Sequence, residues 1–167
     1  MNSRYFINPS AEDLTRALDS WNWLEIQGKQ VLLVTAFADV LLSAPDGVWV
    51  LDTLEGELKR LCETQGELEE ALKTEEMEDT YLMAPLIDYL VKSGVTLSAT
   101  QCYDYKVHPR LGGQINHENI EVRSFVVALN LRGQLHEQVR HMKPGTKISS
   151  VKFPEEPKAK SWWKLWH

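Results

Sequence analysis

The chain has 167 residues, 43% of them hydrophobic and 25% charged, and its formal net charge is −6. This length and composition are ordinary for one globular domain, and the excess of acid disfavours direct binding to a nucleic-acid backbone. Two cysteines are too few for a disulfide framework, no stretch approaches the roughly 20 apolar residues of a membrane-spanning helix, and residues 1–10 lack the apolar centre of a secretion signal. We therefore expect a soluble, cytoplasmic protein.

The first third of the chain predicts one short helix followed by strands. Ser10 stands in a capping pattern before an amphipathic stretch, which predicts a helix over residues 11–19. Apolar runs predict strands over residues 31–35, 40–43 and 48–51, with a tight turn at residues 45–47 between the last two. Gly56 marks another bend, after which Leu58 and Leu61 fit a strand or a helix equally well. This part of the chain therefore predicts a β-hairpin.

Residues 54–79 carry a concentrated negative charge. They hold ten Asp or Glu residues against three Lys or Arg residues, which gives this segment a charge of −7. A basic partner surface would complement it, but a solvated helix face that only aids solubility has the same pattern. Residues 67–72 within it predict a short helix, on which Glu69 and Glu70 are candidate partner contacts.

The next segments predict a helix, a strand and a turn. An apolar stripe at helical spacing predicts a helix over residues 79–93, which is kinked or restarts at Pro85. Alternating aromatic and polar side chains predict a strand over residues 102–107, which the following His-Pro pair ends. Residues 111–113 contain two glycines and predict a tight turn.

Residues 122–131 are apolar on both sides, and this pattern predicts a central strand that is covered on both faces. Gly133 is expected to end that strand. Residues 134–142 then predict a short helix whose inward side chains are Leu135, Val139 and Met142. We assign four further side chains of this half of the chain to the core: Tyr103, Phe125, Val127 and Leu129.

Groups that could carry catalysis or bind a metal are sparse in the sequence. His136 and His141 are five residues apart, a poor helical spacing for zinc, and no Cys-x-x-Cys pair exists. Neither a nucleophile elbow nor a phosphate-binding loop is present. Cys102 lies in a tyrosine-rich strand and is interpreted as a buried structural thiol, although a spatial Cys–His pair stays open. We expect no cofactor, no metal and no catalysis; a small hydrolase using Cys102 or His136 is the least favoured alternative.

The last residues differ in composition from the rest. Residues 151–167 form a Pro- and Lys-rich linker, expected to be flexible, that ends in a tail with Trp162, Trp163 and Trp166. Such a tail could dock into a partner's groove or on a membrane surface. It could equally fold back on its own domain or stay mobile.

An ordered series of short motifs resembles a known family. The series consists of Gln101-Cys102-Tyr103 with Lys106, Pro109 with Leu111-Gly112-Gly113, Asn119-Ile120, Gly133-Gln134-Leu135-His136 with Gln138-Val139, and Pro144-Gly145-Thr146. Together with residues 33–39 and 46–56, it is similar to the C-terminal domain of type VI secretion DNase-immunity proteins, long catalogued as a domain of unknown function. The likeness covers residues 21–149. His108 and Ala38 depart from it, because the family tends to proline and glycine there.

The resemblance implies a bacterial protein that binds a cognate toxin, such as a nuclease, and neutralises it without catalysis, in the manner of an antitoxin. The alternative is a regulatory or scaffold module that docks through the Trp-rich tail. We expect a single α+β domain with a mixed, mostly antiparallel sheet covered by helices, the sheet combining the hairpin strands with those of residues 102–131. Residues 1–20 would form an N-terminal helical segment, residues 21–150 the immunity-like domain and residues 151–167 the linker and tail.

Candidate partner contacts in the family-like region are polar residues expected on turns: Arg110, His117, Asn119, Gln134 and His136. The alternative for Asn119, Gln134 and His136 is that they satisfy backbone groups around those turns. The sequence leaves the oligomeric state and the identity of the toxin open.

Overall fold

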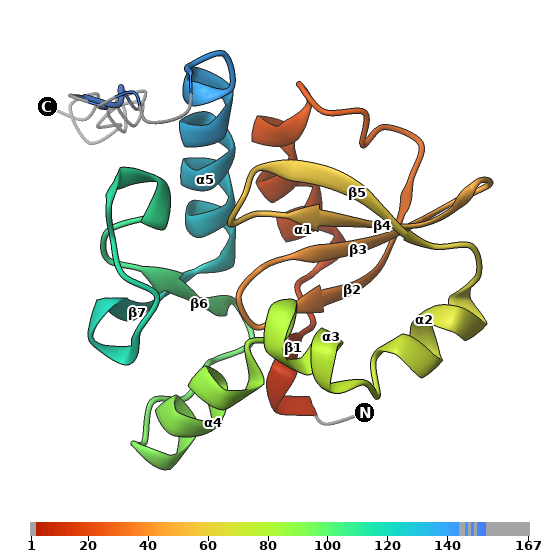
Figure 1. Ribbon diagram of the computed structural model, residues 1–167, viewed down its shortest axis with the longest axis horizontal. Coiled ribbons are helices and arrows are strands. Elements are labelled where there is room, and N and C mark those ends of the chain that lie inside the picture. Colours follow the sequence, from red (N-terminus) through yellow and green to blue (C-terminus); the bar gives the residue numbers. More distant parts are fainter. Residues whose placement is uncertain (1–2, 144–145, 147, 149, 153–167) are drawn as a thin grey trace, which may run out of the picture.

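The β structure consists of two antiparallel sheets (Figure 1). The computed structural model describes residues 3–143, 146, 148 and 150–152. In chain order, the first sheet contains β1 (Phe6–Ile7), β2 (Gln30–Thr35), β3 (Val40–Ala44), β4 (Gly47–Asp52) and β5 (Glu57–Cys62). The second sheet pairs β6 (Gln101–Tyr105) with β7 (Ile120–Ser124). The α+β class is confirmed, but the strands that we expected in one sheet lie in two.

Five α-helices and four 3₁₀ turns complete the described part of the chain. The helices are α1 (Ala11–Leu18), α2 (Gln65–Ala71), α3 (Glu75–Thr80), α4 (Ala84–Lys92) and α5 (Phe125–Val139). The 3₁₀ turns are Ser3–Tyr5, Asp19–Trp21, Pro109–Leu111 and His117–Asn119. Short polar side chains begin the first three helices: Ser10, Thr64 and Thr74 each accept a hydrogen bond from a backbone N–H three residues later. The capping pattern at Ser10 and the short helix near residues 67–72 are thereby confirmed.

The predicted hairpin is present as β3 and β4, which pair from Val40 with Leu51 to Ala44 with Gly47. The segment that fitted either a strand or a helix is the strand β5, which adds to β4 on the outer edge of the sheet. Gly56 lies in the left-handed region with a φ of +74°, where residues other than glycine are disfavoured. That glycine therefore allows the tight reversal from β4 to β5.

The helix expected over residues 79–93 restarts rather than kinks. Helix α3 ends at Thr80, and Met83 adopts a left-handed conformation with a φ of +51° before α4 begins. Pro85 lies in the first turn of α4, where its missing N–H costs no helical hydrogen bond. The first two residues of the expected helix, 79 and 80, therefore belong to α3 rather than to α4.

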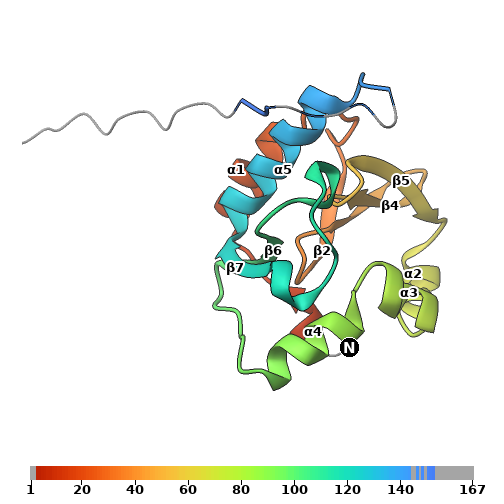
Figure 2. The ribbon, with the colours of Figure 1, turned by 60° about the vertical axis from the view of Figure 1, so that its left-hand side comes forward.

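The prediction of a central strand over residues 122–131 is wrong. Strand β7 ends at Ser124, and α5 runs through the apolar stretch and past Gly133. The stretch is apolar on both sides because α5 packs against α1 on one side and against the sheets on the other (Figure 2). Gly133 does not break the helix. Its lack of a side chain lets α5 approach Ser20, whose carbonyl oxygen would be 2.7 Å from an added Cβ.

The change from strand to helix also changes two core assignments. Phe125 and Leu129 are buried, as predicted, and so is Tyr103. Val127, however, is 46% exposed, because it falls on the outer face of α5. Met142 is 43% exposed and lies beyond the end of the helix, whereas Leu135 and Val139 point inward as expected.

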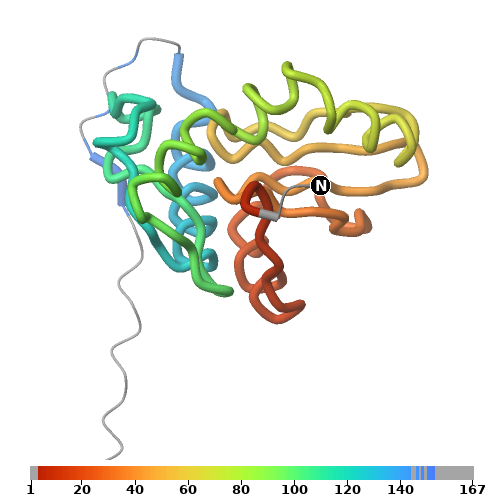
Figure 3. The backbone as a smooth tube through the Cα atoms, turned by 90° about the horizontal axis from the view of Figure 1, so that it is seen from below, coloured from red at the N-terminus to blue at the C-terminus, as the bar shows by residue number. Residues whose placement is uncertain are grey.

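Helices cover both faces of the five-stranded sheet. Figure 3 shows α1 on one side of it and α2 to α4 on the other. Neighbouring residues of a strand point to opposite faces, so Leu41 belongs to the cluster under α2 to α4, and Leu42 to the cluster under α1 and α5. Trp21 is fully buried in the second cluster, and its indole N–H donates to the Leu129 carbonyl at 3.0 Å. The two sheets meet where Tyr103 N–H donates to the Ala36 carbonyl at 2.8 Å.

Candidate functional site

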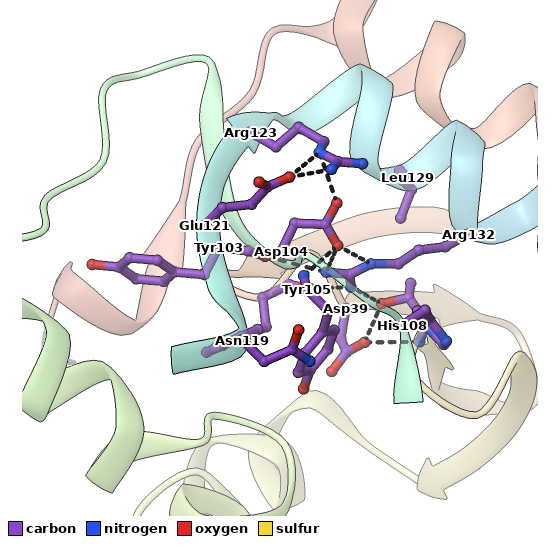
Figure 4. A network of polar contacts seen from close by, with 12 residues as sticks. Asp39, Tyr103, Asp104, Tyr105, His108, Asn119, Glu121, Arg123, Leu129 and Arg132 are labelled. Carbon is purple, nitrogen blue, oxygen red and sulfur yellow. Dashed lines mark hydrogen bonds and ion pairs between the residues drawn. The ribbon is translucent and has the colours of Figure 1, made fainter. Parts of the chain in front are cut away.

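A buried arginine occupies the junction between the two sheets (Figure 4). Arg132 of α5 is 3% exposed and donates all five of its N–H groups. Nε and Nη2 donate to Asp104 Oδ1 at 3.1 and 2.8 Å, and the second Nη2 hydrogen reaches the Tyr103 carbonyl at 3.2 Å. Nη1 donates to the Phe37 carbonyl at 2.6 Å and to Thr53 Oγ1 at 2.7 Å. No N–H of Arg132 is left for a ligand, so its role is structural. We call Arg132 the clamp, because it holds segments of both sheets together.

Two carboxylates complete this network. Asp104 also receives Arg123, whose Nε lies 3.2 Å from Oδ2 and which contacts Glu121 as well. Asp39 accepts two hydrogen bonds on Oδ1, from Thr53 N at 2.8 Å and from Thr53 Oγ1 at 2.7 Å. The Thr53 hydroxyl therefore links Arg132 to Asp39. Burial and the nearby Asp52 raise the pKa of Asp39 to about 6.

Two buried histidines lie beside the network. The rings of His108 and His136 are 5.2 Å apart, and His136 Nε2 lies 3.2 Å from the Thr53 carbonyl. Burial lowers the pKa of His108 to about 3 and that of His136 to about 4, so both imidazoles are neutral at physiological pH. His108 Nδ1 accepts from Arg110 N at 3.2 Å, a cap that the proline typical of the family could not supply. The other departure, Ala38, has a φ of +70°, which explains why glycine suits that position.

Cys102 is completely buried on β6, and burial raises the pKa of its thiol to about 12. A thiol in this state is a poor nucleophile at neutral pH, because the thiolate is the reactive form. Among the described residues, no three His, Cys, Asp or Glu side chains are grouped so that they could hold a metal ion. The chemistry of this region is therefore that of a rigid polar junction.

Exposed acids run from the β4–β5 turn and β5 to α2 and α3. We call this surface the acidic face. Its ten side chains are all exposed: Glu55, Glu57, Glu63, Glu67, Glu69, Glu70, Glu75, Glu76, Glu78 and Asp79. Lys73 pairs with Glu70 at 2.7 Å, Lys59 with Glu57 at 3.3 Å, and Arg60 approaches Glu63 at 4.0 Å. The other seven acids form no ion pair with any residue that the structure describes.

The candidate contact residues fall into separate places. Glu69 and Glu70 lie together on the acidic face, and Arg110 and His117 are exposed on the loop between β6 and β7. The ring of His117 contacts the ring of Tyr89 of α4 at a tilt, with the ring centroids 4.4 Å apart.

Two of the remaining polar candidates, Asn119 and His136, contact backbone groups of the protein itself. Asn119 bridges its loop through three hydrogen bonds to Val107 and Gln114. Gln134 is half-buried, with Oε1 lacking a partner among the described residues, and His136 is buried beside Thr53. Trp162, Trp163 and Trp166 lie outside the described residues.

Sequence reasoning missed the polar junction. Asp39 interrupts an apolar run of residues 31–43, and Arg132 follows directly after the apolar run that we interpreted as a strand. A charged residue inside an apolar run is a signal, because such residues are almost never fully buried unless they are paired. Asp104, at the centre of the predicted strand of residues 102–107, is the partner that this reasoning lacked.

Comparisons with known proteins agree with the family-like motifs. Residues 63–136 match the model of the family described as T6SS immunity protein Tdi1, C-terminal, which confirms the predicted resemblance over this segment. A solved structure, "Crystal structure of Atu4351 from Agrobacterium tumefaciens", shares 22% identity at a TM-score of 0.51, covering 80% of this chain and 68% of that one; it supports the fold. Curated proteins give no significant match. No helix in the described part of the chain is long and apolar enough to cross a membrane.

Proposed function

We propose that this chain, whose residues 63–136 match the type VI secretion immunity family, is a non-catalytic immunity protein that acts in the cytoplasm of the producing bacterium. It binds a cognate protein toxin and blocks it by covering a surface that the toxin needs. The observation that carries this proposal is that α2, α3 and most of the acidic face fall inside the family-matched segment.

The charge of the acidic face favours a nuclease as the toxin. A protein that binds DNA must present basic residues to the phosphate backbone. A surface with seven unpaired exposed acids is complementary to such residues, and it also speeds association with them. Because the acids are exposed to solvent, the attraction is screened by salt.

Co-expression with the toxin encoded beside this gene tests the proposal. We expect the wild-type protein to restore growth and to purify in a complex with the toxin. Glu69→Gln with Glu70→Gln should slow association, and the slowing should shrink as salt is raised. Glu12→Gln with Glu137→Gln removes the same charge from other exposed positions and serves as the matched control. Continued cell death without a complex would defeat the proposal.

A second candidate is a regulatory or scaffold module that docks through the Trp-rich tail. It is favoured by one contact: Gln138 of α5 forms two hydrogen bonds, of 2.7 and 3.0 Å, with the backbone of Lys152, which belongs to the linker that leads to the tail. Deleting residues 158–167 separates the two candidates. Unchanged protection supports immunity through the domain, whereas loss of function on deletion supports docking through the tail.

A further inference from the structure

A small cavity opens beside the polar junction, between the end of the first sheet and the segment that joins α3 to α4. Its volume is about 230 Å³, and its walls include Asp39, Asp52, Glu55, Tyr81, Met83 and Tyr105. This volume is below the roughly 300 to 1,000 Å³ of sites for small molecules. The cavity is therefore sized for the end of a single side chain rather than for a cofactor.

One oxygen of the largely buried carboxylate of Asp39 is open at the cavity. Asp39 is only 7% exposed, and both of its hydrogen bonds are made by Oδ1. Oδ2 accepts no hydrogen bond from any residue in the described ranges, and Figure 4 shows dashed lines on one oxygen of Asp39 only. Oδ2 is not among the buried polar atoms that lack a partner, so it is accessible from the cavity. The fold thus holds an acceptor ready for a donor from outside.

The cations at the cavity are already engaged. Arg132 uses all five N–H groups, as described above, and its charge is matched by Asp104. Lys59 lies 3.0 Å from Asp52 and 3.3 Å from Glu57. Asp39 and Glu55 therefore face the cavity without a cation of their own among the described side chains. A positively charged group entering the cavity would meet Glu55 and Asp39, whose charge is only partly offset by Arg132 through Thr53.

The walls favour a flat, delocalised cation. Tyr81 and Tyr105 line the cavity, and aromatic faces attract guanidinium groups more often than ammonium groups. Arg132 already lies over the ring of Tyr105, with Cζ 5.7 Å from the ring centroid, so the attraction for an incoming guanidinium is expected from Tyr81. A guanidinium also presents several N–H donors in one plane, which suits two carboxylates at one site. The cavity lies at the border of the acidic face, because Glu55 belongs to both.

We propose that this cavity receives the side chain of one arginine of the protein partner, with Asp39 Oδ2 and Glu55 as its acceptors and Tyr81 and Tyr105 as its walls. This inference rests on the proposed function, since it describes how the chain binds one side chain of the toxin. The acidic face attracts the basic partner over a distance, and the cavity fixes one of its arginines in place. Arginines seated in buried pockets of this kind dominate the binding energy of many interfaces.

Binding of a small arginine probe to the purified full chain tests the cavity without a toxin. The probe is N-acetylarginine methylamide, followed by the backbone amide signals of Thr53 and Tyr105 in NMR spectra. We expect saturable shifts of these signals, and none with the citrulline equivalent, which has the same shape without the charge. Equal binding of the citrulline compound, or no saturable shift, would overturn the inference.

Variants of the chain then locate the site. Asp39→Asn keeps an oxygen for the two Thr53 hydrogen bonds and removes the charge, so it should weaken probe binding at least about tenfold. Glu55→Gln, at an exposed position where folding is not at risk, should weaken it several-fold and covers the case in which Asp39→Asn does not fold. Glu69→Gln lies on the acidic face outside the cavity and should leave binding unchanged. If Glu69→Gln weakens probe binding as much as Asp39→Asn does, the probe is attracted by the overall negative charge rather than by the cavity, and the inference is wrong.

The toxin of the adjacent gene separates this inference from the proposed function. If that toxin binds the wild-type chain and the Asp39→Asn variant equally well, the cavity inference is wrong and the proposed function stands. If the arginine probe binds and no toxin does, the cavity is supported as an arginine site and the proposed function fails.

Discussion

Arg132 and Asp104 lie 28 residues apart and form a buried ion pair in which Nη2 and Oδ1 are 2.8 Å apart. Both side chains are almost fully buried, at 3% and 5% exposed. The pair joins α5 to β6, while the remaining donors of Arg132 hold the Phe37 loop and the end of β4. One side chain thereby fixes the five-stranded sheet, the two-stranded sheet and α5 to one another.

Replacing Arg132 by methionine should lower the free energy of unfolding by about 3 to 5 kcal/mol, because Asp104 is left buried with one of its two cations removed. Denaturant unfolding followed by circular dichroism measures the loss. Arg16→Met, at a side chain that is 63% exposed, is the matched control and should change stability by less than about 0.5 kcal/mol. A loss below 1 kcal/mol for Arg132→Met would show that the clamp contributes little.

The location of this clamp explains which parts of the fold could be predicted from the sequence. Local signals were sufficient for the cap at Ser10 and for the hairpin at residues 45–47, because the residues that determine them are neighbours in the chain. Neighbouring residues alone did not determine that residues 125–139 form the helix α5. An apolar run of this length fits a covered strand or a buried helix, and only the packing of α1 on one side and the sheets on the other decides between them.

For the candidate site, too, the sequence predicted only the features that depend on local composition. The acidic face follows from composition, since an acid-rich segment with few apolar residues must be exposed. The cavity beside Asp39 does not, because its walls come from residues 37–59, 80–83, 105 and 132, which the fold alone brings together. A lone Asp in an apolar run signals a buried polar contact, but its partner Thr53 is identified only in three dimensions.

Substitutions in α5 distinguish the helix from the expected strand. Val127→Lys should change the free energy of unfolding by less than about 0.5 kcal/mol, because Val127 is 46% exposed on the outer face of the helix. Leu129→Ala should cost about 2 to 5 kcal/mol, because Leu129 is completely buried against Trp21 and its neighbours. In a strand, both side chains would lie on the same face. Equal losses for the two variants, measured by denaturant unfolding, would support the strand.

Alanine at Gly56 should destabilise the protein more than alanine at Gly94. Both glycines have a left-handed φ, of +74° and +82°, which costs another residue about 1 to 2 kcal/mol. At Gly94 an added Cβ meets no atom within 4 Å, whereas at Gly56 it would overlap the ring of His136. The difference between the two variants in thermal unfolding therefore isolates the close contact between the β4–β5 turn and α5. Equal melting temperatures would mean that His136 moves aside freely.

The buried histidines predict how stability depends on pH. The pKa values of His108 and His136 are lowered by burial from 6.5 to about 3 and about 4, so the unfolded chain binds protons in a range where the folded protein does not. Stability should therefore fall as the pH drops from about 6.5 toward 4. Asp39 acts in the opposite direction, because its pKa is raised from 3.8 to about 6, so the folded protein gains a proton there first and is stabilised over that range.

The lowered pKa values of the two histidines together outweigh the raised pKa of Asp39. The net effect of acid in this range is therefore a loss of stability. Melting temperatures recorded from pH 7.5 to 4.5 measure it. His136→Gln should flatten the dependence, and Asp39→Asn should steepen it because the opposing group is gone. His117→Gln, at an exposed histidine, is the matched control and should leave the slope as it is. A wild-type protein that melts at a constant temperature across this range would show that the histidines are protonated without strain in the folded state.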